Sequence, residues 1–296
     1  MKTCGRHSYW QQTSVVRQVA FTLLVFLINL LSAHTDNSSD IAKLQTEWHG
    51  PGTTLDLKEI ILGRCYNYIR TINPALNYVN CTNVWEAFQN VFVNKDPCDI
   101  KKEDYSDFME LTRHPIPCGM SVFWSKTNKL VHDYARVIAH YMTLEQTLYG
   151  YLADKLKWCG KIHGEGIDYK SCPTRKQCSN NPLSSFWSQA SKTFAGEACG
   201  NVTLMLNGSV GGGAFREDSL LATVEIPNLN KDNVTLVQIW VMDDVTGIDR
   251  ESCGQGSIVR LESLLKEKQI PYSCMDNYRP VHFLQCAEHP DSPSCK

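Results

Sequence analysis

The chain has 296 residues, 43% of them hydrophobic and 20% charged, with a formal net charge of −2. This length and composition predict a globular protein with one large domain or two small ones. No acidic residue precedes Asp36, so the rest of the chain is the more acidic part, and it lacks the basic stripe of a nucleic-acid-binding protein.

The N-terminal segment combines basic residues with an apolar run. Lys2, Arg6 and Arg17 precede VAFTLLVFLINLLSA at 19–33. Two interpretations fit this pattern: an uncleaved signal-anchor whose basic end stays in the cytoplasm, or a cleaved signal peptide. We favour the anchor, because the basic segment is long for a signal peptide. We therefore expect a single-pass type II protein of the plasma membrane, or a secreted protein if cleavage occurs, with a cytoplasmic tail at 1–17, a transmembrane helix at 18–34, a stalk at 35–47 and an ectodomain at 48–296.

The cysteines and sequons agree with an extracytoplasmic ectodomain. Cys4 lies on the proposed cytoplasmic side, and the other twelve of the 13 cysteines lie from Cys65 to Cys295. An even number in an oxidising compartment predicts six disulfides, although sequence alone leaves their pairing open. No C-x-x-C pair and no Cys/His cluster has zinc-site spacing, so no metal is expected. Five N-x-S/T sequons predict glycosylation at Asn37, Asn80, Asn201, Asn207 and Asn233.

The first part of the predicted ectodomain is mainly helical. Apolar residues at helical spacing predict helices over 56–70 and 83–92, the second with Asn83 and Glu86 as a capping box. Thr143-Leu-Glu-Gln146 repeats the capping pattern and predicts the start of another helix.

Strands and helices alternate in the rest, which predicts a small, mostly parallel sheet. The expected strands are 120–124, 202–206, 222–226 and 236–242, with helices at 128–140 and 257–267. The fold class is therefore α+β or α/β. We expect a helical subdomain (48–118 and 143–195) and an α/β subdomain (119–142 and 196–296), with a cleft between them.

Common catalytic motifs are absent. The chain has no G-x-S-x-G elbow, H-E-x-x-H helix or Walker P-loop, and Gly211–Gly213 is interpreted as a surface loop. The nine histidines are scattered and are assigned to the surface or to packing. Trp124 and Glu225 fall at the carboxyl ends of two predicted strands, where ligands of open α/β sheets bind, and they suit a ligand with a sugar and a planar ring.

Several segments resemble the ADP-ribosyl cyclase/cyclic ADP-ribose hydrolase family of ectoenzymes, and within it the vertebrate type II membrane branch. The resemblance covers 48–295 and all twelve ectodomain cysteines. The matching segments are WHGPGTT (48–54), VWEAFQNVFVNKDPC (84–98), FWS (123–125), TLEQTLYGYLADKLKWCG (143–160), CSNNPLSSFWSQASKTFA (178–195), TLMLNGS (203–209), TVEI (223–226) and YRPVHFLQC (278–286).

The resemblance implies a reaction and a disulfide pairing. The family cleaves the nicotinamide–ribose bond of NAD to give ADP-ribose and cyclic ADP-ribose, hydrolyses cyclic ADP-ribose and exchanges the base of NADP, with products that act in calcium signalling. NAD and NADP are then substrates, and no cofactor is expected. The family associates Cys118–Cys199 with cyclic ADP-ribose hydrolysis. The implied disulfides are Cys65–Cys81, Cys98–Cys178, Cys118–Cys199, Cys159–Cys172, Cys253–Cys274 and Cys286–Cys295.

The resemblance also implies catalytic roles. Glu225 matches the essential carboxylate that stabilises or traps the ribosyl centre. Trp124 and Trp187 match two tryptophans that stack on the substrate rings. Glu145 matches the residue that steers cyclisation against hydrolysis, and Asp154 a carboxylate on the nicotinamide amide. A continuous helix would place Glu145 and Asp154 on opposite faces, so either Gly150 breaks that helix or only one of them reaches the substrate.

Phosphate contacts are expected from Ser125, Lys126 and Ser191, and from the backbone near Ser219, Leu220 and Leu221. The chain departs from the family at three positions: Lys126 replaces an Arg, Leu220 a Thr or Phe, and Gln146 an Asp. These departures leave the ratio of the two products open.

A second hypothesis is a non-enzymatic receptor or adhesion ectodomain on the same scaffold. We favour the enzyme because Glu225, Glu145, Trp124 and Trp187 are all retained. A homodimer and protein partners at the cell surface are further expectations.

Overall fold

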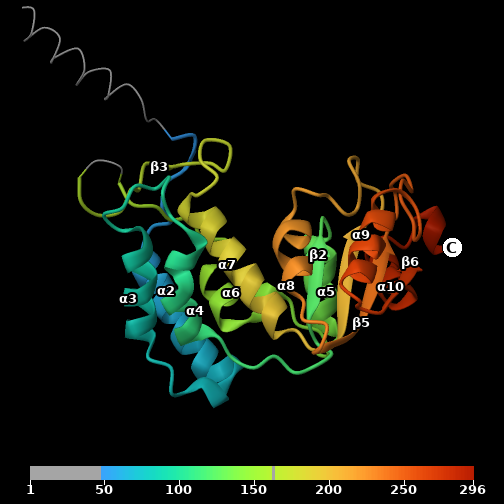
Figure 1. The fold of residues 1–296 in the computed structure, drawn as a ribbon, viewed down its shortest axis with the longest axis horizontal. Coiled ribbons are helices and arrows are strands. Elements are labelled where there is room, and N and C mark those ends of the chain that lie inside the picture. The colour runs from blue at the N-terminus through green and yellow to red at the C-terminus, as the bar shows by residue number, and fades with distance from the viewer. Residues whose placement is uncertain (1–47, 162–163) are drawn as a thin grey trace, which may run out of the picture. The chain divides into compact units, whose positions relative to one another are not determined.

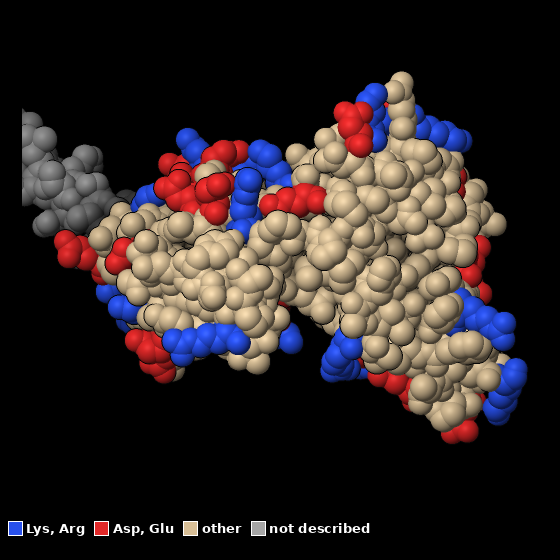
Figure 2. Space-filling model, turned by 90° about the horizontal axis from the view of Figure 1, so that it is seen from below, with Lys and Arg blue, Asp and Glu red and all other residues tan. Residues whose placement is uncertain are grey.

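The computed structural model describes residues 48–161 and 164–296. The predicted tail, signal-anchor and stalk, with Cys4 and the Asn37 sequon, lie outside the described residues. Within the described part, no helix is both long and apolar enough to cross a membrane. From His49 onward the chain forms one compact unit. Basic and acidic side chains are interspersed on the face of it that Figure 2 shows.

Helices cluster on one side of this unit around an aromatic core (Figure 1). Phe88 lies at the centre, with its ring centroid 4.9 Å from that of Trp158 and 6.1 Å from that of Phe186. These rings and their neighbours are almost completely buried, so burial of apolar area stabilises this part of the fold. The helices are α2 (Leu57–Asn67), α3 (Cys81–Phe92), α4 (Ser106–Thr112), α6 (Leu148–Ala153) and α7 (Pro182–Glu197), with short turns η1 (Tyr68–Ile72), η2 (Pro74–Leu76), η3 (Lys102–Tyr105) and η4 (Leu144–Gln146).

The other side is built on a four-stranded sheet in the order β2-β4-β5-β6, with every strand pair parallel. The predicted mostly parallel sheet is therefore confirmed. Successive residues of a strand face opposite sides of the sheet. Because residues of both kinds are buried here, helices cover both faces, as is usual for parallel sheets. Leu204 and Ile239 face α9, whereas Met205 and Trp240 face α5 and α10. The elements are β2 (Val122–Ser125), β4 (Gly200–Asn207), β5 (Val234–Met242), β6 (Tyr272–Asp276), α5 (Asn128–Val137), α9 (Gly256–Glu267) and α10 (Arg279–Glu288).

Three further elements are short. β1 (Gly50–Pro51) pairs antiparallel with β3 (Ser171–Cys172). The last turn is η6 (Pro293–Cys295). One hydrophobic core runs without a break from α2 through the sheet to α9, so the division into two subdomains stays a prediction.

The predicted strand at 222–226 is wrong. The segment forms a π-helical turn, η5 (Leu221–Glu225), which continues into α8 (Ile226–Asn228). Ser219 starts the turn, because its Oγ accepts from the Ala222 N–H at 3.2 Å. The β-branched residues suggested a strand, but parallel strands β4 and β5 need a crossover, and this segment supplies its helical part.

Two predicted helix starts also differ. The helix expected from Asn83 begins at Cys81, with Asn80 as its N-cap accepting from the N–H groups of Thr82 and Asn83. The helix expected from Thr143 begins as the 3-10 turn η4, and Thr147 then adopts an extended conformation before α6. β6 was not predicted, because its residues are only partly buried and show no clear alternation.

Six disulfides join the twelve cysteines from Cys65 to Cys295, in the pairing that the resemblance implies. Two of them close long loops. Cys98–Cys178 spans 80 residues and Cys118–Cys199 spans 81. The second ties the segment before β2 to the start of β4, so it fixes one end of the sheet beside the helices.

One predicted glycosylation site lies in the interior. Asn207 is only 7% exposed, and its Nδ2 donates to the Lys126 carbonyl oxygen and to Asp244 Oδ1. The amide nitrogen that would carry a glycan is buried and donates both of these hydrogen bonds, which argues against the predicted glycosylation of Asn207. Asn80, Asn201 and Asn233 are exposed and remain predicted sites.

Gly150 provides a test of how α6 meets η4. A Cβ at Gly150 would overlap the carbonyl oxygen of Leu144, whereas a Cβ at Gly63 in α2 would meet nothing within 4 Å. Gly150→Ala should destabilise the chain by about 1–3 kcal/mol, as expected for overpacking. Gly63→Ala, the matched control, should stabilise it by about 0.5–1 kcal/mol. Denaturant unfolding of both variants checks this, and equal effects would show that the close approach carries no strain.

Candidate active site

A cavity of about 440 Å³ lies where the carboxyl end of β2 meets η4, α7 and η5. Every residue that the sequence nominated for catalysis or substrate binding lines it. These are Trp124, Ser125, Lys126, Glu145, Asp154, Trp187, Ser191, Ser219, Leu220, Leu221 and Glu225. A neighbouring cavity of about 550 Å³ shares Arg175, Trp187 and Leu220 with it, so the two adjoin at these residues.

Glu225 is the most deeply buried carboxylate of the cavity. It ends η5, so its predicted place at the end of a strand is wrong although its place in the site is not. Ser191 Oγ on α7 donates a hydrogen bond to Glu225 Oε1 at 2.7 Å. Burial raises the pKa of Glu225 to about 7; the Ser191 hydrogen bond acts to lower that pKa, and the nearby charge of Glu145 adds to the rise. Near neutral pH this carboxyl is therefore poised between its two protonation states.

Glu145 lies in the same cavity, but its pKa is shifted in the opposite direction from that of Glu225. Its Oε2 is 3.2 Å from His132 Nε2 on α5 and 3.5 Å from Trp124 Nε1 at the end of β2. Burial alone would raise the pKa of Glu145, but the hydrogen bond and charge of His132 outweigh it, so that pKa lies below its usual range. The pKa of His132 is raised in turn, first by this hydrogen bond. The site therefore holds an ion pair beside a carboxyl that readily takes a proton.

His132 was missed by the sequence analysis, which assigned the histidines to the surface or to packing. The available signal was its position: His132 lies one turn into the helix that directly follows the FWS strand end. A side chain on the first turns of such a helix is close to the ligand-binding edge of the sheet.

Asp154 reaches the same cavity as Glu145 because the chain between them is not one helix. Thr147, with φ −70° and ψ 160°, interrupts it, and Asp154 caps the end of α6 with ψ 129°. Gly150 lies within α6 and does not break it. The first alternative, a break at Gly150, is therefore wrong. Both carboxylates line the cavity, and direct contact of each with the substrate stays a prediction.

The predicted phosphate-binding side chains are not equivalent. Ser125 is buried and its Oγ has no partner among the described residues, so this hydroxyl is available to a ligand. Ser191, by contrast, donates its hydroxyl to Glu225. At Ser219 only the backbone was predicted to bind phosphate, and its hydroxyl donates to the Arg216 carbonyl oxygen. Lys126 lies in the turn after β2 and has φ 61°. Asn207 Nδ2 stabilises this turn by donating a hydrogen bond to the Lys126 carbonyl oxygen.

Two arginines were also missed. Arg175 and Arg216 both line the cavity. Arg216 is about one-third exposed, and its Nε is buried with no partner in the described part of the chain. Its ion-pair partner is Asp218, 3.6 Å away and largely exposed. For Arg216, the only sequence signal was that a basic residue lies three positions before Ser219, near the segment expected to bind phosphate.

Comparison with known proteins identifies the family. The family model described as ADP-ribosyl cyclase matches residues 54–295. Human ADP-ribosyl cyclase/cyclic ADP-ribose hydrolase 2 is 43% identical over 251 residues, covering 85% of this chain and 79% of the relative. This chain belongs to the ADP-ribosyl cyclase family. The resemblance to this family stated from the sequence is thus confirmed, whereas the assignment to the type II membrane branch stays a prediction.

Two solved structures of family members are similar to the chain. Porcine CD38 with a covalent intermediate, ribo-F-ribose-5'-phosphate, has a TM-score of 0.75 and 43% identity, covering 78% of this chain and 100% of that chain. Aplysia cyclase with substrate NGD and product cGDPR has a TM-score of 0.77 and 35% identity, covering 83% and 98%. The fold class predicted for this chain agrees with both.

The raised pKa of Glu225 predicts a measurable effect on stability. The folded chain binds this proton more tightly than the unfolded chain, whose carboxyl has a pKa near 4.5. Stability therefore falls as the pH rises from about 4.5 to about 7, by up to about 3 kcal/mol. Glu225→Gln should remove this loss, since the amide oxygen still accepts from Ser191.

We expect Glu225→Gln to be more stable than the wild type at pH 8 and nearly equal to it at pH 4.5, as measured by denaturant unfolding. A stability difference that is the same at both pH values would show that Glu225 titrates normally.

Proposed function

We propose that this chain cleaves the nicotinamide–ribose bond of NAD and partitions the ribosyl intermediate between ADP-ribose and cyclic ADP-ribose. The observation that carries the proposal is Glu225, a buried carboxylate hydrogen-bonded to Ser191 in a cavity that also contains Trp124, Trp187 and Glu145. The family membership and the ligands named for the two similar structures support it. NAD and NADP enter this scheme as substrates, and the scheme requires no cofactor.

The first step follows from the charge of the substrate. When the bond between ribose C1′ and the pyridinium nitrogen breaks, its electron pair goes to nicotinamide, which leaves neutral. Positive charge then develops on the ribosyl ring, where ionised Glu225 stabilises it or forms an ester with C1′. Trp124, Trp187 and Asp154 line the same cavity. In this proposal the two tryptophans stack on the substrate rings and Asp154 binds the nicotinamide amide.

The second step decides the product. Water attacking C1′ gives ADP-ribose, and N1 of the adenine of the same molecule gives cyclic ADP-ribose. A free base in place of nicotinamide gives base exchange, which the family carries out on NADP. Glu145 is proposed to influence this partition, because it lies in the same cavity as Glu225 and their charges interact.

Product analysis tests the proposal. The full chain incubated with NAD should release nicotinamide together with ADP-ribose and cyclic ADP-ribose. Glu225→Gln should lower kcat by a factor of about 1,000 or more, as expected when a preorganised charge is lost. If the wild-type chain released no nicotinamide, the non-enzymatic receptor hypothesis would replace this one.

The pH profile should report the ionisation of Glu225. Because only the ionised carboxylate stabilises the ribosyl cation, kcat/KM for nicotinamide release should rise with pH, with a midpoint near 7. Ser191→Ala removes the hydrogen bond that lowers this pKa, so its midpoint should lie higher. Ser188→Ala on the same helix lines only the neighbouring cavity and is the control, expected to keep the wild-type midpoint.

Arg216 is proposed to bind the substrate diphosphate. Lys126 stands where the family has an arginine, and a lysine lacks the planar fork that binds two phosphate oxygens at once. Arg216 lines the same cavity, with a guanidinium whose Nε has no partner among the described residues. We infer that Arg216 supplies the missing fork.

Arg216→Lys keeps the charge and should raise KM for NAD about tenfold with little change in kcat, because a hydrogen bond to a charged group contributes about 1.5 kcal/mol. Arg113→Lys, in an exposed ion pair with Glu110, is the matched control and should leave KM unchanged. An unchanged KM in Arg216→Lys would assign phosphate binding to other residues.

The membrane topology rests on the N-terminal sequence. We propose that the signal-anchor at 18–34 holds the catalytic ectodomain outside the cell, which agrees with the disulfides. Mass spectrometry of the mature N-terminus distinguishes this topology from a cleaved, secreted form.

A further inference from the structure

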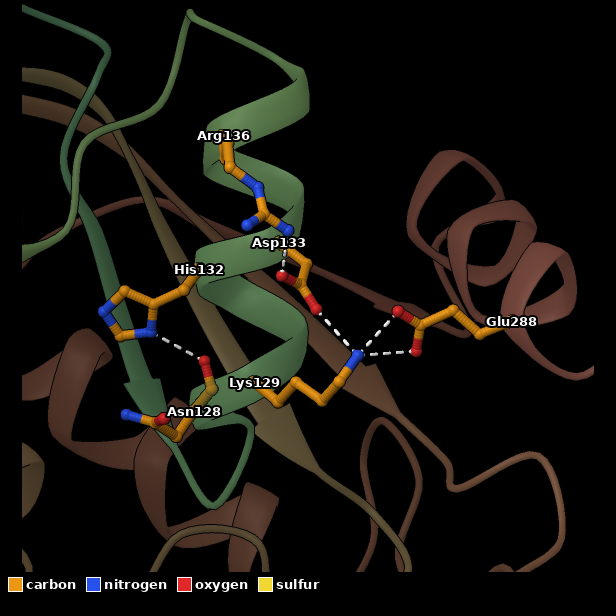
Figure 3. A network of polar contacts seen from close by, with 6 residues as sticks. All are labelled: Asn128, Lys129, His132, Asp133, Arg136 and Glu288. Carbon is orange, nitrogen blue, oxygen red and sulfur yellow. Dashed lines mark hydrogen bonds and ion pairs between the residues drawn. The ribbon is translucent and has the colours of Figure 1, made fainter.

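His132 has an oxygen acceptor at each of its two ring nitrogens. Nδ1 lies 2.6 Å from the carbonyl oxygen of Asn128, and Nε2 lies 3.2 Å from Glu145 Oε2 (the first contact is drawn in Figure 3). A backbone carbonyl only accepts, so Nδ1 carries a proton. If Glu145 is ionised, Nε2 must carry a proton as well. This geometry therefore requires an imidazolium whenever Glu145 is a carboxylate and the contact is made.

A second partner is available to the neutral ring. Thr143 Oγ1 lies 3.4 Å from the same Nε2, and its hydroxyl, which also forms a hydrogen bond with the Glu145 carboxylate, can instead donate its proton to an unprotonated ring nitrogen. Thr143 is fully buried and precedes η4, the turn that carries Glu145. His132 thus faces two alternative partners on one short segment: a carboxylate for its charged form and a hydroxyl for its neutral form.

The helix that carries His132 is held in place independently of this contact. Lys129 Nζ bridges Asp133 on α5 and Glu288 on α10, and Figure 3 shows His132 on the other side of the helix from this bridge. Val131 and Tyr134 pack in the core between α5, α10 and the sheet. When the contact at His132 Nε2 changes, we therefore expect η4 to move and α5 to stay in place.

Charged groups from each neighbouring element favour the imidazolium. Besides Glu145 on η4, these are Asp154 at the end of α6 and Asp133 on α5 itself. The Trp124 ring on β2 lies 5.9 Å away, edge-on to the imidazole. Partial burial opposes the charge, but the hydrogen bond to Glu145 outweighs it, so the pKa of His132 is above its ordinary value.

Building on the proposed function, we propose that His132 is a positioning residue that controls whether Glu145 can act as a base, and that its protonation state sets the ratio of ADP-ribose to cyclic ADP-ribose. In the charged state, the imidazolium holds Glu145 Oε2 in an ion pair, where it is a poor proton acceptor. In the neutral state, Nε2 accepts from Thr143 and Glu145 is released.

The chemistry of the two products gives the direction. When water attacks ribose C1′, a C–O bond forms and the water must lose a proton, which released Glu145 can accept. Attack by adenine N1 uses a nitrogen lone pair and requires no base at that moment. Deprotonation of His132 therefore favours hydrolysis, so the share of ADP-ribose should rise with pH.

The first experiment measures the product ratio from NAD between pH 5.5 and 9 with the full chain. The wild type should show a several-fold rise in ADP-ribose relative to cyclic ADP-ribose through a single midpoint. His132→Gln should give a ratio that does not change with pH and lies near the high-pH value of the wild type. Arg260→Met, which removes an exposed positive charge from α9 on the opposite face of the sheet, should keep the wild-type curve.

Thr143→Val separates this switch from a merely structural role. The hydroxyl stabilises the neutral ring, so its removal should move the midpoint of the ratio to higher pH and leave the curve otherwise intact. A ratio independent of pH in the wild type, or a wild-type pH dependence in His132→Gln, would overturn the proposal.

A second measurement does not depend on catalysis. NMR titration of the His132 ring should give a midpoint above 6.5, which Glu145→Gln should lower by about one to three pH units, because it removes the opposite charge. An unchanged midpoint in Glu145→Gln would overturn the proposal even if the chain released no nicotinamide. Failure of the proposed function is therefore distinguishable from failure of the switch.

Discussion

Glu225 is a carboxylate buried where η5 meets α7, with Ser191 donating to one of its oxygens. Placing an ionised carboxylate in such an environment is unfavourable, and the raised pKa is the expression of that cost. The other carboxyl of the pair, Glu145, is kept ionised by His132. Two carboxyl groups in one cavity therefore have environments that drive their pKa values apart, as is common where they take different roles. In the proposed reaction, the cationic ribosyl ring supplies the positive charge that Glu225 otherwise lacks.

The topology of the sheet explains how these groups meet. Parallel strands need long crossover connections, and two successive crossovers carry most of the site. The connection from β2 to β4 contains α5, η4, α6 and α7, and so carries His132, Glu145 and Ser191. The next one, from β4 to β5, carries Glu225. The disulfide Cys118–Cys199 ties the segment before β2 to the end of this first crossover, and so constrains the elements that form the cavity.

Residue type and periodicity were enough to predict the parallel sheet and much of the helical part, because buried strands and amphipathic helices follow local patterns. They failed at 222–226, where a β-branched run forms a π-turn because the crossover requires a helix there. The site was predicted through its resemblance to a family rather than from spacing. Its electrostatics could not be predicted, because the contact between His132 and Glu145 joins two elements that only the tertiary fold brings together.

The consequences of the chain's departures from its family also depend on contacts that only the tertiary fold brings together. The resemblance implies that Gln146 replaces an aspartate beside Glu145, and Gln146 does not line the cavity. Its Oε1 accepts from the Thr143 N–H at 2.8 Å, and its carbonyl accepts from the Tyr68 hydroxyl at 2.8 Å. Gln146 therefore closes the turn that carries both alternative partners of His132. An aspartate has a side chain one carbon shorter and would close that turn differently. We therefore expect residue 146 to influence the products through the geometry of Thr143 and Glu145 and without a contact to the substrate.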